Sequence, residues 1–519
     1  MWIQEFNRLQ ELVHAESFRS QYASWWAIHA GTKPGAASID EDYDFGILIL
    51  RICLISLQNL PHVKYPTEGI LKVDLGGVEQ WFYSLAGRLE KSRSAEKKPS
   101  LITVQYQFFH VGYLKNYARL RECWSVLTTT IKDVHEMGLH LQHPNLPLTE
   151  LEMEMRRRTF WNIYVFDRYM CTSFGHWPLI PEGYFDIDVP HDTIQALTTS
   201  PYILTPFTDR IFHIKLARWQ TAFMSPPAWQ DDQRDPLVVA EFAQQFEEVI
   251  ANQLPAPFWI DNPDKSWDTV EPSIISKRET LYLSIFSTKA ALYGAFADPC
   301  HSLRGKSRVC SDKGLIFLAL SHRRSLMNVT CKVITSIQKT YVLSDNGASY
   351  RLFMLPISLI DALASLGVCL LSIQADQRRL EMEGIQISPD AELQCHYATF
   401  FDAFNLLCQL APNYGIVQRG LKLLGGLHGI LRASLSEPNI SDTFTPPIAV
   451  LPATMDPCGF DQVLGAETYP LEQALAALSP PGNADSHECP LFPIPKWVPD
   501  YLESTSRSWL FQEKTFGNL

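Results

Sequence analysis

Apolar side chains recur along much of the chain at steps of three or four residues, a spacing that gathers them on one face of an α-helix. The pattern is strongest over residues 102–134. Asn116 is expected at a turn that folds this stretch into a helical hairpin, and Gly138 is expected to end the second helix. We interpret the aromatic-rich stripe as core packing between helices rather than as a ligand-stacking surface. Its members are Ile102, Tyr106, Phe109, Tyr113, Tyr117, Leu120, Trp124, Leu127, Ile131 and Val134.

A second strong helix signal covers residues 148–171. Thr149 stands three residues before Glu152, an arrangement typical of a capping box at the start of a helix. Two glutamates of this helix each precede an arginine by four residues, which predicts ion pairs worth a few tenths of a kcal/mol each. These expected pairs are Glu152–Arg156 and Glu154–Arg158.

The apolar run at residues 160–166 lies on the same predicted helix and must be enclosed by other elements. Asp167 and Arg168 follow it directly, so both charges are expected inside the core. An unpaired buried charge is very costly. We therefore expect Asp167 to pair with an arginine or to cap backbone amides, in a structural network rather than in acid–base chemistry.

Helical spacing also predicts helices over residues 45–57, 281–296, 315–337, 352–373 and 393–410. The chain shows no convincing alternation of apolar and polar residues of the kind that marks strands, and no repeat of fixed period. The predicted fold class is therefore all-α, with many helices and a Pro-rich acidic tail.

We expect three parts: an N-terminal helical segment over residues 1–40, a helical domain over residues 41–432 and a tail over residues 433–519. Residues 225–275 are rich in Pro and Asp and predict a long, partly ordered insertion. Residues 433–495 contain no Lys or Arg and eight Asp or Glu. Such a composition is typical of a disordered tail and equally of a disordered activation segment.

The formal net charge of −12 argues against nucleic-acid binding by the chain as a whole, because that affinity comes largely from clustered Lys and Arg. The 11 cysteines form no Cys-x-x-Cys pair, so we interpret them as free thiols in a reducing compartment. No secretory signal pattern opens the chain. Residues 355–373 contain Asp361 and three serines, which favours a buried core helix over a membrane span. We interpret the charged run at residues 91–98 as a solvated surface link rather than a nuclear-import signal.

Two fragments resemble reactive motifs but fail on spacing. His135 and His140 are five residues apart, which on a continuous helix places their rings about 140° apart rather than the about 40° of a zinc-binding pair. The sequence Gly305-Lys306-Ser307 lacks the leading glycine and the preceding strand of a phosphate loop.

A third fragment, Asp231, Asp232 and Asp235, matches the DDxxD pattern with which all-helical terpene synthases bind magnesium diphosphate. Prolines flank the fragment on both sides, and no second metal motif follows it. We therefore favour an exposed acidic loop over a magnesium site. A surface link is likewise expected for the alternating acidic residues Asp186, Asp188 and Asp192.

Several short strings between residues 104 and 190 form a pattern when they are taken together. They are Glu136-Met137-Gly138-Leu139-His140, Glu154-Met155-Arg156-Arg157-Arg158-Thr159-Phe160-Trp161, Tyr164-Val165-Phe166-Asp167-Arg168-Tyr169, Gly175 to Pro178, and Ile187-Asp188-Val189-Pro190. The combined pattern resembles the fungal-specific transcription factor domain, the middle homology region of Zn2Cys6 zinc-cluster regulators. Weaker similarity extends the resemblance over residues 40–430.

The sequence departs from the family pattern in three places. The usual Gly-Arg-Pro becomes Gly175-His176-Trp177-Pro178, and a later Leu-His-Arg-Pro becomes Leu292-Tyr293-Gly294-Ala295. The zinc cluster of the family needs six cysteines with two Cys-x-x-Cys pairs. The first hundred residues contain only Cys53, so we expect no zinc cofactor in this chain.

The resemblance implies an all-α regulatory domain of nuclear proteins that control transcription, often of metabolic or biosynthetic genes. It implies protein partners in the transcription machinery, and it leaves open a homodimer, a zinc-cluster partner and a small-molecule effector. We therefore expect a nuclear transcription regulator and no enzyme. The alternatives are an all-helical magnesium-dependent enzyme that uses the Asp231 to Asp235 motif, and a degenerate interaction scaffold. The signature residues, for which the resemblance implies a structural role, are Gly138, Arg156, Arg157, Arg158, Trp161, Asp167, Arg168 and Pro190.

Overall fold

The protein is described by a computed structural model. The described residues are 2–3, 7, 10–29, 39–58, 75–93, 97–117, 119–142, 147–174, 177–191, 208–223, 235–271, 273–297, 313–343, 355–382, 391–410 and 415–435. Over these ranges the chain forms thirteen α-helices, two short 3-10 helices and no strand, which confirms the all-α prediction. The predicted acidic tail lies outside them from residue 436 onward.

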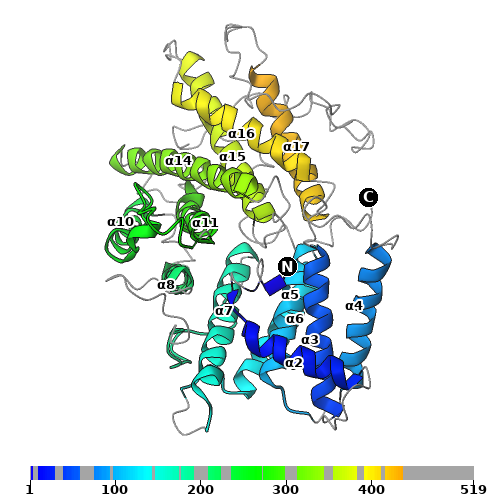
Figure 1. Cartoon of the computed structure of the whole chain (residues 1–519). Coiled ribbons are helices and arrows are strands. Elements are labelled where there is room, and N and C mark those ends of the chain that lie inside the picture. The colour runs from blue at the N-terminus through cyan, green and yellow to red at the C-terminus, as the bar shows by residue number, and fades with distance from the viewer. Residues whose placement is uncertain are drawn as a thin grey trace.

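The first helices of the chain form one bundle, drawn in blue and cyan in Figure 1. Within it α3 packs on α4 and α5, α5 packs on α6, and α7 packs on both α5 and α6. Helix α2 crosses α3, where the ring of Phe18 lies 5.8 Å from that of Phe45. The bundle consists of α2 (Ala15–His29), α3 (Ile39–Gln58), α4 (Leu75–Ser92), α5 (Leu101–Asn116), α6 (Leu120–Glu136) and α7 (Glu150–Phe174).

The predicted hairpin is confirmed, because α5 ends at Asn116 and α6 begins at Leu120. The predicted capping box of α7 is also present: the Thr149 N–H donates to the Glu152 carboxylate at 2.8 Å, and the Glu152 N–H donates to the Thr149 hydroxyl at 3.2 Å. The turn between α5 and α6 and the start of α7 thus lie where the local sequence signals predict them.

The later helices form a second bundle in which α11 and α14 pack along one another. Helix α15 contacts α14, α16 and α17, and α10 contacts α11 and α14. Helix α8 lies between the two bundles, since it packs on α7 of the first and on α11 of the second. These elements are α8 (Thr208–Phe223), α10 (Pro236–Gln253), α11 (Ser273–Tyr293), α14 (Lys313–Leu343), α15 (Leu355–Met382), α16 (Ala391–Leu410), α17 (Gly415–Leu435) and the 3-10 helices η4 (Ala256–Phe258) and η5 (Gly294–Phe296).

Helix α10 falls inside the interval 225–275, for which the sequence predicts a partly ordered insertion. Asp235 accepts a hydrogen bond from the Leu237 N–H at 2.9 Å and caps the helix, and Pro236 occupies its first turn. Beyond α10, Arg278 of α11 anchors the following loop through Asp268, at 2.6 Å. Residues 235–271 thus contain α10 and the 3-10 helix η4, followed by a loop that is anchored to α11.

Helix α15 is the described segment long and apolar enough to cross a membrane, over Leu355–Arg378. Its most apolar part is 83% buried within the protein, as expected for a core helix. Gly367 lies at the crossing with α17, where an added Cβ would approach Leu427 Cγ at 2.9 Å and Phe400 Cε2 at 3.0 Å. The helix is thus enclosed by its neighbours, in agreement with the interpretation from sequence.

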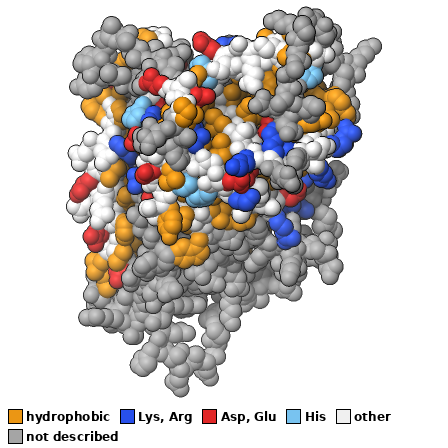
Figure 2. Space-filling view, turned by 90° about the horizontal axis from the view of Figure 1, so that it is seen from below, with side chains coloured by type: hydrophobic (Ala, Val, Ile, Leu, Met, Phe, Trp, Pro, Cys, Tyr) orange, Lys and Arg blue, Asp and Glu red, His pale blue; other side chains and the backbone are white. Residues whose placement is uncertain are grey.

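The face of the molecule in Figure 2 carries both signs of charge. Lys and Arg side chains there lie among acidic and apolar side chains rather than in one continuous basic area. An electrostatic footprint for a phosphate backbone requires Lys and Arg gathered on one face. The described atoms visible on this face show no such footprint.

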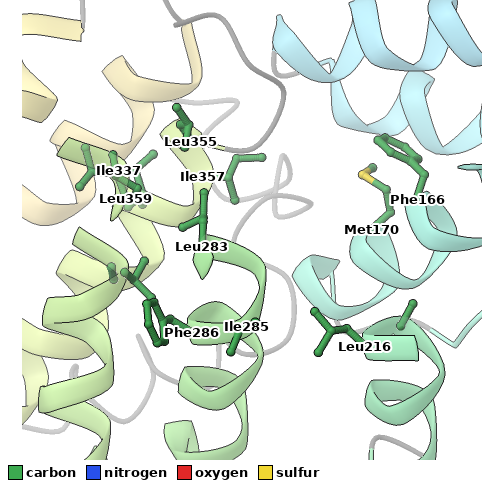
Figure 3. Close-up of a cluster of buried hydrophobic side chains, with 14 of the residues drawn as sticks. Phe166, Met170, Leu216, Leu283, Ile285, Phe286, Ile337, Leu355, Ile357 and Leu359 are labelled. Atoms are coloured by element: carbon green, nitrogen blue, oxygen red, sulfur yellow. The ribbon is translucent and has the colours of Figure 1, made fainter. Parts of the chain in front are cut away.

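Buried apolar side chains form one cluster that includes residues of both bundles. Figure 3 shows part of it, with Phe166 and Met170 on α7, Leu216 on α8 and Leu283 on α11. Because apolar burial is the main favourable term in folding, this shared cluster makes α8 part of both packing units.

Candidate functional site

The signature residues gather around α7, where this helix meets the end of α6, the loop at residues 177–191 and α8. The structure brings seven of the eight into contact with a neighbouring segment through a hydrogen bond, an ion pair or a backbone turn, and Pro190 is buried beside them. We call this set the α7 network. Its members hold segments that are far apart in the sequence.

Asp167 is the most enclosed charge of the α7 network, with no exposed side-chain surface. Its carboxylate accepts hydrogen bonds from the backbone N–H groups of Leu179 at 3.1 Å and Ile180 at 3.2 Å. It also pairs with Arg168 at 2.5 Å. Burial raises the pKa of Asp167, and the charge of Arg168 and the two amides oppose that shift. Asp167 therefore makes both of the contacts expected from its position, an arginine pair and an amide cap.

The Arg168 guanidinium extends the network to α8. It donates to the Thr221 hydroxyl at 2.6 Å and to the Ile180 carbonyl at 2.6 Å. It also lies over the Tyr164 ring, 4.1 Å from the centroid. The Tyr164 hydroxyl donates to Glu182, whose other oxygen is 3.6 Å from Arg218 of α8. One guanidinium thus ties together α7, the loop that follows it and α8.

A second cluster lies about two and a half to three and a half turns before Asp167 on α7. Glu154, fully buried, pairs with Arg158 at 2.8 Å and accepts the His191 N–H at 3.0 Å. Arg158 also pairs with Glu11, at 2.7 Å, so it holds the N-terminal segment against the helix. Arg157 is 3.8 Å from Asp188. The predicted Glu154–Arg158 pair is confirmed, and tertiary partners surround it.

Arg156 and Gly138 together close the end of α6. Gly138 adopts a left-handed conformation with φ of 63°, and the Leu139 N–H reaches back to the Val134 carbonyl at 3.0 Å. Arg156 donates to the Met137 carbonyl at 2.9 Å, which places a positive charge at the negative end of the helix dipole. The prediction of a Glu152–Arg156 ion pair is therefore wrong. Arg156 instead donates a hydrogen bond at the end of α6, and Glu152 forms the capping box with Thr149.

Trp161 and the acidic residues after α7 connect the loop to α6. The Trp161 indole donates to the Asp188 carbonyl at 2.8 Å. Gln142 donates its side-chain amide to the Asp188 carboxylate at 3.0 Å and its backbone N–H to Asp186 at 2.6 Å. Asp186 and Asp188 thus position a loop instead of standing free in a surface link, and Asp192 lies outside the described residues.

Comparison with known proteins agrees with this arrangement. The sequence profile described as "Fungal specific transcription factor domain" matches residues 2–249, a stretch that contains the whole α7 network. Residues 2–249 are thus similar to the fungal specific transcription factor domain. The domain as matched ends within α10, and α11 to α17 follow it.

Named relatives are themselves transcription factors. The chain is 28% identical over 298 residues to the "Probable transcription factor sol4" of Alternaria solani, an alignment covering 55% of this chain and 50% of that protein. It is 23% identical over 305 residues to "Transcription factor xilB" of Penicillium rubens, covering 55% and 44% respectively. The chain thus spans about half the length of the curated relatives it matches. No solved structure matches it.

The spacing argument for His135 and His140 requires a correction. Their rings were expected far apart, but His135 and His140 have centroids 4.5 Å apart. The angular argument assumes a continuous helix, whereas the left-handed Gly138 turns the chain back on itself. Among the described residues, no group of three His, Cys, Asp or Glu is placed to hold a metal ion.

The structure describes only one of the three aspartates of the candidate magnesium motif. Asp235 is the cap of α10, a structural role, and Asp231 and Asp232 lie outside the described residues. The phosphate-loop fragment at residues 305–307 also lies outside them, as do Gly175 and His176.

Among the buried charges that the sequence did not predict is Asp44. Asp44 of α3, 3% exposed, pairs with Arg93 at 3.2 Å and with Lys97 at 3.0 Å. Thr103 also donates to it, at 3.3 Å. Two basic residues of the run 91–98 are therefore held against the bundle and not solvated as predicted. The available signal was an acidic residue directly before an apolar helical run.

The α7 network contains no group poised for reaction. Beside the network, burial raises the pKa values of the Tyr164 hydroxyl and the Cys171 thiol, so neither ionises near neutral pH. Each charged member has an opposite charge or a backbone group as partner. The arrangement can align α6, α7, α8 and the loop at 177–191, which is a positioning role.

Proposed function

We propose that this chain is a transcription regulator that works in the nucleus and acts through its helical body and acidic tail. The observation that carries the proposal is the match of residues 2–249 to the fungal specific transcription factor domain. Relatives named as transcription factors support the same assignment.

The α7 network supports a regulatory body over a catalytic one. Its charged side chains form ion pairs with opposite charges and hydrogen bonds with backbone groups, so they hold neighbouring segments of the interior together. We propose that the chain has no catalytic role. The cap formed by Asp235 leaves the magnesium-enzyme alternative without support.

Contact with DNA is proposed to come from a zinc-cluster module outside this sequence, either in a partner protein or encoded separately. The sequence holds no Cys-x-x-Cys pair, and two such pairs are what a zinc cluster needs. The net charge of −12 is likewise unsuited to a phosphate backbone.

A reporter experiment tests the proposal. The full chain is fused to a foreign DNA-binding domain, and a reporter bearing that domain's sites is measured in fungal cells. Reporter output is expected to change relative to the foreign domain alone, and the change should shrink when residues 433–519 are removed. A fluorescent fusion should accumulate in the nucleus. A silent reporter together with a cytoplasmic signal would contradict the proposal.

A further inference from the structure

Helix α17 has a side that no described element covers. It packs on α15 and α16 through buried apolar residues such as Val417, Leu424 and Leu431. In Figure 1 it forms the outer edge of the second bundle. Its opposite side, at 100° per residue, is one continuous strip that we call the open face. The open face consists of Gln418, Arg419, Lys422, Gly426, Gly429 and Ala433, all exposed.

Two glycines of the open face have no explanation in the described packing. A Cβ added at Gly426 or Gly429 would meet no atom within 4 Å. By contrast, a Cβ at Gly367 or Gly420 would collide with Leu427 or Ile360, so those two glycines serve helix crossings already present. Glycine is unfavourable inside a helix, and its usual compensation is the close approach of another segment. The open face is therefore suited to a closely packed partner.

The open face is also basic. Helix α17 contains Arg419, Lys422 and Arg432 and no acidic residue. Arg419 and Lys422 form no ion pair within the described part of the chain. A partner with carboxylates spaced along a helix would complement these two charges.

Such a segment exists in the same chain. The chain continues past Leu435, the end of α17, into residues 436–519. Leu471, Leu475 and Leu478 have the i, i+4, i+7 spacing of one helical face, with alanines between them. Pro470 suits the first turn of a helix. Glu467 and Glu472 precede or begin this stretch, and residues 433–495 hold no Lys or Arg.

The connection is long enough for the two to meet. Residues 436–469 form a tether of 34 residues between α17 and the segment. For 34 residues, the random-coil relation gives an r.m.s. span of about 30–35 Å. Helix α17, with 21 residues, is about 31 Å long. Tethering on this scale gives an effective concentration on the order of millimolar, so a weak contact is enough to be populated.

We propose that residues 467–478 dock on the open face of α17 through a short helix that begins at Pro470. The leucines would pack over Gly426 and Gly429, with Glu467 and Glu472 beside Arg419 and Lys422. This contact goes beyond the proposed function, because it would form whether or not the tail recruits other factors. It gives the tail a resting position on the second bundle.

Carbodiimide cross-linking of the purified full chain tests the contact, because this reagent joins an amine to a carboxylate only when the two touch. Mass spectrometry should find Lys422 joined to Glu467 or Glu472. In a mixture of ¹⁵N-labelled and unlabelled chains, the joined peptides should come from one chain. Lys132 of α6, 74% exposed, is the internal control and should join no carboxylate of residues 467–478. Absence of the Lys422 link, or a link found only between chains, overturns the proposal.

Matched variants in the tail leave α17 itself unchanged. Leu475→Asp is expected to abolish the Lys422 link, because it places a charge in the packed face of the segment. Leu491→Asp, in a separate apolar stretch of the tail, should keep the link. Persistence of the link in Leu475→Asp, or its equal loss in both variants, counts against docking. An unchanged reporter signal together with an intact Lys422 link would contradict the proposed function but not the docking of the tail.

Discussion

Asp167 and Arg168 are neighbours on α7, and their side chains meet at 2.5 Å while they are 0% and 2% exposed. Adjacent residues on a helix point about 100° apart, so the pair forms because both side chains turn toward the loop at residues 177–191. The loop supplies two N–H groups to Asp167 and a carbonyl to Arg168. The pair is thus a joint between α7 and the loop.

Replacing Asp167 with Asn should destabilise the protein strongly. The substitution leaves the buried Arg168 charge with only its longer contact to Glu182, at 3.4 Å. Breaking a buried ion pair costs about 3–5 kcal/mol. Urea unfolding followed by circular dichroism measures the change. The control is Glu122→Gln, which removes an exposed pair with Arg119 and should cost about 1 kcal/mol or less. Equal losses of unfolding free energy in the two variants would show that burial does not determine how much the Asp167–Arg168 pair stabilises the protein.

Replacing Gly138 with Ala should lower the free energy of unfolding by about 1–2 kcal/mol, because a side chain at φ of 63° is strained. Asn tolerates this conformation better, so Gly138→Asn should lose less. The order of urea midpoints, wild type above Asn above Ala, is the expected result. An Ala variant as stable as the wild type would mean that the chain turns at this point without a left-handed residue.

Replacing Gly367 with Ala should cost about 1–3 kcal/mol, since the new methyl group overpacks the crossing of α15 with α16 and α17. Gly87 of α4 is the matched control, because a Cβ there meets nothing within 4 Å. Gly87→Ala should raise stability by up to about 1 kcal/mol through helix propensity. Opposite signs of the two effects in thermal unfolding are the test, and a stabilised Gly367→Ala would contradict the close crossing.

His213 should make stability depend on pH. Burial lowers its pKa to about 4, and the nearby Arg210 adds to this effect. The folded state then binds fewer protons than the unfolded state between pH 6.5 and about 4, so stability is full above pH 6.5 and falls as the pH drops through this window. Full loss is on the order of 3 kcal/mol.

A His213→Gln variant isolates this contribution. Burial also lowers the pKa of His110 on α5, so more than one histidine makes the stability of the wild-type protein depend on pH. The difference in unfolding free energy between wild type and variant should therefore shrink by about 2–3 kcal/mol from pH 7 to pH 4.5. A difference that stays constant over that range would place the His213 pKa near its unfolded value.

Local signals in the sequence predicted many of the helices. The hairpin of α5 and α6, the capping box of α7 and the spans of α11, α14, α15 and α16 follow from periodicity and end signals over short distances. Helix α10 was missed although Asp235 and Pro236 form a helix start, because the surrounding Pro and Asp suggested a loop. Helix α17 was missed because its glycines resemble helix breakers.

The family signature named the residues of the α7 network, but their contacts were only partly foreseen. The sequence predicted that Asp167 would pair with an arginine or accept hydrogen bonds from backbone amides. It did not predict that these amides would be those of Leu179 and Ile180. The redirection of Arg156 to Met137 and the burial of Asp44 against Arg93 were not expected. The proposed absence of a zinc cofactor and the 41–432 domain boundary stay predictions.

The sequence alone determined that the described part of the protein is all-α and where many of its helices lie, because helix hydrogen bonds join residues four apart and the apolar stripe repeats at that same local spacing. Only the tertiary structure decided which buried charges face one another. A pair such as Arg158 and Glu11 is separated by 147 positions, and its geometry depends on how the intervening helices pack. The local periodicity of apolar residues does not specify how the helices pack.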